Sequence, residues 1–222
     1  MLKPSFEEEH YYKSKSKTKE EDIDYESPVD FTNLQAVNPD IYAWLYVVDS
    51  NINYPILQRE DDDTYYLKRD SEENLSEIGA LFTEGTYNAT DFSDPVTIIY
   101  GHMMRNGMMF GNLQENYSDP ERFNEQKEII VYLPDQELHY EVFASVPYDN
   151  RHILYNYDFH NQRIFYLFFN EILSIREIGA NFDEGITVSP DDHVLVLSTC
   201  LKGNDDRRFL VFARLREKNG LS

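Results

Sequence analysis

The single cysteine of the chain, Cys200, ends the apolar run HVLVLSTC, and the polar stretch LKGNDDR follows it. In most proteins a free cysteine in an apolar strand is a buried, inert thiol. The end of the run changes this expectation, because side chains at a strand end meet loops and solvent. Cys200 is therefore a candidate nucleophile as well as a candidate core residue.

A nucleophilic thiol needs a group that protonates the leaving amine, and histidine suits this role because imidazole ordinarily titrates near neutral pH. His102 ends the strand-like run PVTIIYGH directly after Gly101, so it also lies where a strand gives way to a loop. The other five histidines have weaker positions, at the starts of predicted strands or in polar segments: His10, His139, His152, His160 and His193. His102 is the expected acid.

A third group is Arg208, which opens the next apolar run, RFLVFARL, eight residues after Cys200. A hairpin-like return would place its guanidinium beside the thiol, where it can stabilise negative charge on a carbonyl oxygen during acyl transfer. Arg207 should then point to the opposite face of the strand. From the hairpin alone, a surface ion pair with Asp205 or Asp206 is an equally good interpretation.

Eight short apolar runs, each bounded by Asp, Asn, Gly or Pro, predict the strands that must position these groups. They are IYAWLYVV, INYPIL, GALFTEG, VTIIYGH, EIIVYL, LHYEVFASV, HVLVLSTC and RFLVFARL. Eight such runs in one domain indicate a mostly β fold, a barrel or a sandwich. In a barrel, two strand ends can bring His102 and Cys200 together although 98 residues separate them along the chain.

Two segments have helical rather than strand-like spacing. Asp30 is a suitable cap for a short helix through FTNLQAV. Residues 162–178 carry apolar side chains three or four positions apart, with Asn161 before them and Gly179 after them. This pattern predicts an amphipathic helix inserted between strands.

Composition excludes several classes of function. Lys and Arg number 20 and Asp and Glu number 41, so the net charge of −21 argues against nucleic-acid binding and favours simple solubility. One cysteine forms no disulfide framework. No zinc-type cysteine pair, phosphate-binding loop, HExxH or GxSxG motif occurs, and EDDD at 60–63 lacks the spacing of an EF-hand. We expect no metal and no organic cofactor.

The first 27 residues mix charge with Ser and Lys and lack the apolar core of a signal peptide. No apolar run approaches the roughly 18 residues that cross a bilayer. We expect a soluble chain, with 1–27 as a flexible stem and 28–222 as one catalytic domain.

In their order along the chain, the motifs resemble class B sortases, the cysteine transpeptidases of Gram-positive surfaces. The matching pieces include DFTNLQAVNPDIYAWLYV, INYPILQREDDDTYYLKRD, GALFTE, TIIYGHMMRNGMMFGNL, HYEVFASV, DDHVLVLSTC and RFLVFARL, from about residue 30 to residue 216. The resemblance implies an eight-stranded β-barrel with N-terminal helices and an extra helix before the strand that carries the cysteine.

The same resemblance assigns roles to residues. His102, Cys200 and Arg208 match the catalytic histidine, nucleophile and arginine. Positions that line the family's substrate groove are matched by Ser198, Thr199, Tyr100, Leu67 and Asp63. The chain also departs from the family pattern: Asp63 replaces a common Asn, Met103 follows the histidine, and Lys202 and Arg207 lie in the segment after the cysteine.

The implied reaction is cleavage of a C-terminal sorting motif of surface proteins after its Thr, through a thioester on Cys200. The acyl group then passes to an amine of a cell-wall precursor. The resemblance further implies that an N-terminal anchor holds the full-length protein at the extracellular face of the membrane. Three alternatives stay open: a class B pilin polymerase whose acceptor is a pilin lysine, a peptidase whose acceptor is water, and a non-catalytic peptide-binding barrel.

Overall fold

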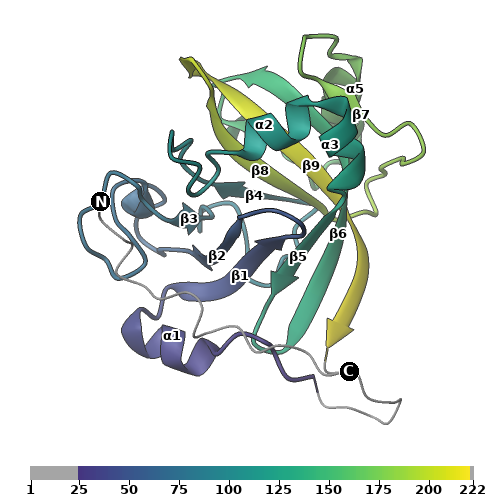
Figure 1. Ribbon diagram of the computed structural model, residues 1–222. Helices are drawn as coiled ribbons and strands as arrows, with labels where there is room; N and C mark the ends of the chain where they lie inside the picture. Colours follow the sequence, from purple (N-terminus) through teal and green to yellow (C-terminus); the bar gives the residue numbers. More distant parts are fainter. Residues whose placement is uncertain (1–24, 221–222) are drawn as a thin grey trace.

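Eight strands close into a barrel in the order β5-β1-β2-β3-β4-β8-β9-β6, and pairing of β6 with β5 completes the circle (Figure 1). The computed structural model describes residues 25–220. The barrel strands are β1 Ile41–Val47, β2 Asn53–Leu57, β3 Leu81–Phe82, β4 Val96–Tyr100, β5 Glu128–Tyr132, β6 Gln136–Asp149, β8 Val194–Leu201 and β9 Asn204–Gly220. Each predicted run supplies one of these strands, so the mostly β, eight-stranded fold is confirmed.

One further strand lies outside the barrel circle. β7, Asn181–Phe182, pairs with the second half of the long strand β6, whose first half pairs with β5. Only Phe182 of this strand is apolar, so no apolar run marks it, whereas the equally short β3 lies within the run GALFTEG.

The strands around the site are buried on both faces, which explains their continuous apolar sequences. On β8, Leu195 and Leu197 face the barrel interior, whereas Val194 and Val196 belong to a second apolar cluster on the outside. Helix α5, Gln162–Ser174, covers that outer face with four buried side chains: Phe165, Phe168, Phe169 and Ile172. Figure 1 shows α5 beside the barrel wall near β7.

Both predicted helices form. Helix α1, Phe31–Val37, is capped by Asp30, whose carboxylate accepts a hydrogen bond from the Asn33 backbone N–H at 3.1 Å. The inserted helix was predicted over 162–178, but α5 ends at Ser174, because the backbone of Ile175 is extended.

Four short helical segments were not predicted: η2 Tyr65–Leu67, α2 Leu113–Ser118, α3 Pro120–Glu125 and α4 Ile153–Asn156. Each has six residues or fewer, too short for a helical period to stand out. Among residues 25–220, no helix is both long and apolar enough to cross a membrane. Residues 1–24 of the predicted stem lie outside the described residues.

Candidate active site

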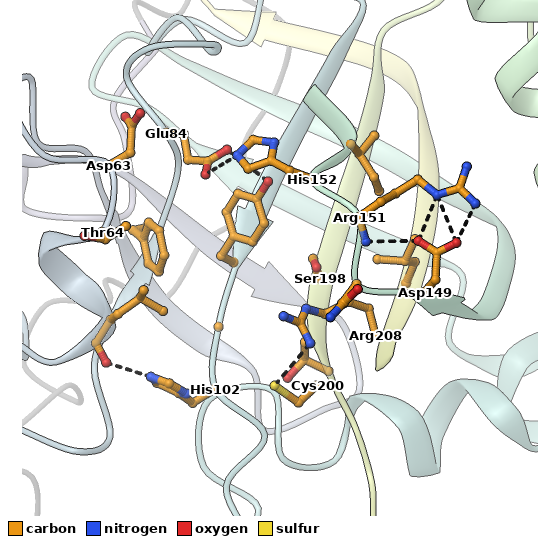
Figure 2. Close-up of a pocket in the computed structure, with 18 residues that line it drawn as sticks. Asp63, Thr64, Glu84, His102, Asp149, Arg151, His152, Ser198, Cys200 and Arg208 are labelled. Carbon is orange, nitrogen blue, oxygen red and sulfur yellow. Dashed lines mark hydrogen bonds and ion pairs between the residues drawn. The ribbon is translucent and has the colours of Figure 1, made fainter. Parts of the chain in front are cut away.

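A pocket of about 240 Å³ opens on the outer face of the barrel at the ends of β4, β8 and β9 (Figure 2). Its wall contains all eight residues predicted to act or to bind substrate: Asp63, Leu67, Tyr100, His102, Ser198, Thr199, Cys200 and Arg208. The fold therefore brings these residues to one place, while their individual roles stay predictions.

Cys200 and Arg208 are direct partners in the antiparallel pairing of β8 with β9. Arg208 Nη1 lies 3.8 Å from Cys200 Sγ. The thiol is half-buried, so it is neither sealed in the core nor fully exposed. The hairpin-like return predicted from the sequence is present, and it places a cation beside the only cysteine.

The guanidinium of Arg208 is held by backbone carbonyls. Nη1 donates to the carbonyl oxygen of Asp205 at 2.9 Å and to that of Arg207 at 3.1 Å. Within the part of the chain that the structure describes, Arg208 forms no ion pair with the carboxylate of Asp205 or Asp206. Arg208 thus carries a positive charge that pairs with no carboxylate of the described residues.

His102 follows Gly101 at the end of β4, and its Nε2 lies 2.7 Å from the carbonyl oxygen of Leu67. A carbonyl oxygen only accepts, so Nε2 carries the proton and Nδ1 is the nitrogen left for substrate or thiol. Among the described residues no hydrogen bond joins His102 to Cys200. The two side chains share one pocket wall without forming a bonded pair.

The predicted groove residues differ in their surroundings. Tyr100 stacks on Phe82 with ring centroids 5.5 Å apart, giving the pocket an aromatic surface. Ser198 and Thr199 are almost fully buried, and among residues 25–220 the Thr199 hydroxyl has no hydrogen-bond partner. Asp63 accepts a hydrogen bond from the Thr86 backbone N–H at 3.1 Å, which ties its loop to the turn after β3.

Among the pocket residues that were not predicted to be functional, Glu84 and His152 form a hydrogen-bonded pair. His152 Nδ1 accepts a hydrogen bond from the Tyr155 backbone N–H at 3.1 Å, so Nε2 carries the proton and donates to Glu84 at 2.9 Å. The other Glu84 oxygen accepts from the Tyr100 hydroxyl at 3.0 Å. Figure 2 shows this pair well apart from His102 and Cys200.

Burial raises the pKa of Glu84, and the neighbouring His152 and Tyr100 partly oppose the rise. Burial next to Glu84 also raises the pKa of Tyr100. A signal for Glu84 did exist, because it is a charged residue at the end of the apolar run GALFTEG. His152 gave none, since nothing in its polar neighbourhood indicates a partner 68 residues away.

The segment after the cysteine is not the seven-residue loop that the sequence suggested. β8 continues to Leu201 and β9 begins at Asn204, so the turn itself is Lys202 and Gly203. Lys202, Arg207 and Met103 are absent from the pocket wall. Among residues 25–220, no group of three or more His, Cys, Asp or Glu side chains is placed to hold a metal ion.

Comparison with known proteins settles the family. The family model of the sortase domain matches residues 45–216, most of the described chain. The chain belongs to the sortase family. The resemblance to class B sortases drawn from the motifs is confirmed, because similar proteins and solved structures are sortases B.

A curated sortase B of Listeria monocytogenes is 31% identical to this sortase over 173 residues, which cover 76% of this chain and 65% of the relative. This sortase thus spans about two thirds of that relative's length. Sortase B of Bacillus anthracis superposes with a TM-score of 0.76 at 28% identity, covering 95% of this chain and 93% of that one. A class B sortase of Streptococcus pyogenes, described as involved in pilus biogenesis, superposes at 0.70 with 28% identity, covering 85% and 98%.

Proposed function

We propose that this sortase is a cysteine transpeptidase that cleaves a sorting motif of surface proteins and transfers the acyl group to an amine. The observation that carries the proposal is the contact between Arg208 Nη1 and Cys200 Sγ at 3.8 Å. A fixed cation beside a half-buried thiol favours a reaction in which negative charge develops next to sulfur.

In the first step, Cys200 Sγ attacks the carbonyl carbon of the motif's Thr. His102 Nδ1, the nitrogen not used by the Leu67 carbonyl, takes the thiol proton and returns it to the amine as the C–N bond breaks. Arg208 stabilises the oxyanion of the tetrahedral intermediate. The product is a thioester on Cys200 and a released C-terminal fragment.

In the second step, an acceptor amine attacks the thioester, a new amide forms, and the Cys200 thiol is regenerated. Dividing acyl transfer into two steps lets an amine compete with water for the intermediate. We propose a cell-wall precursor amine as the acceptor, and an extracellular location at the membrane through an N-terminal anchor. No cofactor takes part in this scheme.

The test is mass spectrometry after incubation with a panel of sorting-motif peptides. The expected result is a peptide adduct on Cys200 and cleavage after Thr, both lost in Cys200→Ala. Absence of adduct and cleavage with every peptide would count against the proposal. In that case a thiol that also ignores methanethiosulfonate reagents in the folded state would favour the peptide-binding barrel.

One observation favours a second candidate acceptor: a similar class B sortase is described as involved in pilus biogenesis. In that version a pilin lysine attacks the same thioester. Supplying a cell-wall amine, a pilin subunit or water alone to the preformed acyl-enzyme separates the three outcomes by product mass. Rapid release with water alone would indicate a peptidase.

A further inference from the structure

Arg207 and Arg208 are neighbours on β9, yet their side chains make contacts on opposite sides of the strand. Arg208 lies beside Cys200. Arg207 donates through Nη2 to both carboxylate oxygens of Glu177, each at 2.9 Å, and its Nε lies 3.4 Å from the Tyr148 carbonyl oxygen. The Arg207 side chain does not reach the pocket wall.

The two arginines belong to an irregular part of the sheet. Cys200 pairs with Arg208, but the next residue of β8, Leu201, pairs with Asn204. Residues 205–207 therefore have no partner on β8 and form a bulge. Bulges commonly re-aim a side chain next to an active site.

The bulge supplies the acceptors that hold Arg208. Asp205 and Arg207 are the first and last residues of the bulge. The Arg208 guanidinium donates to their carbonyl oxygens at 2.9 and 3.1 Å. The position of the charge beside Cys200 thus depends on where these two carbonyls lie. A contact that holds the bulge in place therefore also holds the Arg208 guanidinium in place.

The bulge lacks support from β8 and is anchored from the other side. β6 pairs Asp149 with Arg207, and Glu177 follows α5, whose phenylalanines are buried on the barrel wall. The side chains of Arg207 and Glu177 are 32% and 49% exposed, so the ion pair is only partly screened by water. Both contacts to Glu177 come from Nη2, and the contact of Nε with the Tyr148 carbonyl oxygen holds the guanidinium at a second point.

We propose that Arg207 and Glu177 are positioning residues: their ion pair fixes the bulge so that the Arg208 guanidinium stays beside the Cys200 thiol. That this arrangement speeds acyl transfer rests on the proposed transpeptidase function. That the ion pair holds the Arg208 guanidinium beside the thiol does not. Anchoring through Glu177 also links the site to the segment that follows α5. The pair acts through Arg208 and touches neither thiol nor substrate.

The position of the Arg208 guanidinium is tested by alkylating Cys200 with iodoacetate, which is anionic, and with iodoacetamide, which is neutral. A cation beside the thiol favours the anionic reagent. In Arg207→Ala and in Glu177→Ala we expect the ratio of the two rates to fall roughly threefold, the size expected for one half-exposed ion pair. Arg208→Ala sets the largest possible fall.

The matched control is Arg216→Ala. Arg216 lies on the same strand, and its Nε is 3.6 Å from a carboxylate oxygen of Glu141. Neither residue lines the pocket that contains Cys200. This variant should leave the ratio unchanged. The charge-swapped double variant, Arg207→Glu with Glu177→Arg, should restore the ratio. Thermal melting of each variant shows whether the fold is intact. An unchanged ratio in both single alanine variants, or a swap that restores melting but not the ratio, would overturn the proposal.

The alkylation ratio needs no peptide, so it separates this proposal from the proposed function. A wild-type protein that forms no acyl-enzyme contradicts transpeptidation and still gives a ratio for every variant. Where turnover occurs, the single variants should lower kcat more than they raise KM, because Arg208 acts on the oxyanion. A rise in KM with kcat unchanged would contradict positioning of Arg208.

Discussion

Arg208 Nη1 lies 3.8 Å from Cys200 Sγ because the two residues face each other across the β8–β9 pairing, just before the pairing becomes irregular. Regular antiparallel pairing thus brings the thiol and the cation together, and the bulge that follows supplies carbonyl acceptors to the guanidinium. The site is built on rigid strands, so the distance between the two groups does not depend on a long loop.

Arg208→Lys should lower kcat/KM for acyl transfer by about a hundredfold, close to the effect of Arg208→Ala. Nη1 alone contacts the two carbonyls and the thiol, so the other N–H groups of the planar guanidinium are donors for an oxyanion. An ammonium keeps the charge but lacks these additional donors. Steady-state cleavage of a sorting-motif peptide measures the loss, and Arg216→Lys is the control. Near wild-type activity in Arg208→Lys would mean that charge alone is enough.

Gly79→Ala should disturb His102, whereas Gly203→Ala should not. Gly79 has φ +64°, and a Cβ there would lie 2.9 Å from His102 Cδ2 and 2.7 Å from the Tyr66 carbonyl oxygen. Gly203 has φ +84° but open space around an added Cβ. Both variants carry the backbone strain of an alanine at positive φ, about 1 kcal/mol, so only the first adds displacement of the imidazole.

The measurement for this pair is acyl-enzyme formation alongside chemical unfolding. Equal activity in the two variants, at similar stability, would show that the position of His102 is not sensitive to its contact with Gly79. A selective loss in Gly79→Ala would place the Leu67–His102 region among the parts that set the rate.

The barrel was predictable because each of its eight strands carries its own apolar run, bounded by turn residues. Elements without such a run were not predictable: α4 has four residues, and only one of the two residues of β7 is apolar. The end of α5 was also misplaced: apolar spacing continues through Ile175 and Ile178, although Ile178 is fully exposed. The spacing of apolar residues in the sequence does not show at which residue the helix ends.

The site was predictable where a strand end carries a reactive residue, as at His102, Cys200 and Arg208. The Glu84–His152 pair was not, because it joins the end of β3 to the start of α4 and depends on tertiary structure alone. The bulge was also hidden, since residues 205–207 read as a polar loop and yet belong to β9. Contacts across the barrel wall leave no local pattern in the sequence.

Phe168→Ala should destabilise the fold by about 3–5 kcal/mol, as expected for a large aromatic removed from a packed core. Phe168 is fully buried on α5, with Phe212 of β9 6.3 Å away between ring centroids. Tyr166→Ala on the same helix should change stability by less than about 0.5 kcal/mol, because Tyr166 is half exposed. Urea unfolding of both variants gives the comparison. Similar losses at the two positions would contradict the packing of α5 on the barrel.

Glu84→Gln should become more stable relative to wild type as the pH rises. The pKa of Glu84 in the folded protein is raised above its ordinary value of 4.5, chiefly by burial. Between these two values the folded state binds more protons than the unfolded state, so wild-type stability falls with rising pH through that window. Glutamine does not titrate, and Glu84→Gln escapes this fall. Below the ordinary value both states are protonated, so the advantage of the variant disappears there.

Asp183→Asn is the control. Its stability relative to wild type should change with pH in the opposite direction to that of Glu84→Gln. The Gly185 backbone N–H and Lys127 hold the pKa of Asp183 below its ordinary value. Its stabilisation is therefore present above the ordinary value and is lost as the pH falls through the folded value. Urea unfolding from about pH 2.5 to pH 7.5 follows both differences from wild type. Above its ordinary value of 4.5, Glu84→Gln should gain on wild type as the pH rises. The Asp183→Asn difference should instead be constant above the ordinary Asp183 value of 3.8 and shrink as the pH falls below it. A Glu84→Gln curve that stays parallel to wild type would mean that His152 and Tyr100 fully offset the burial of the carboxylate.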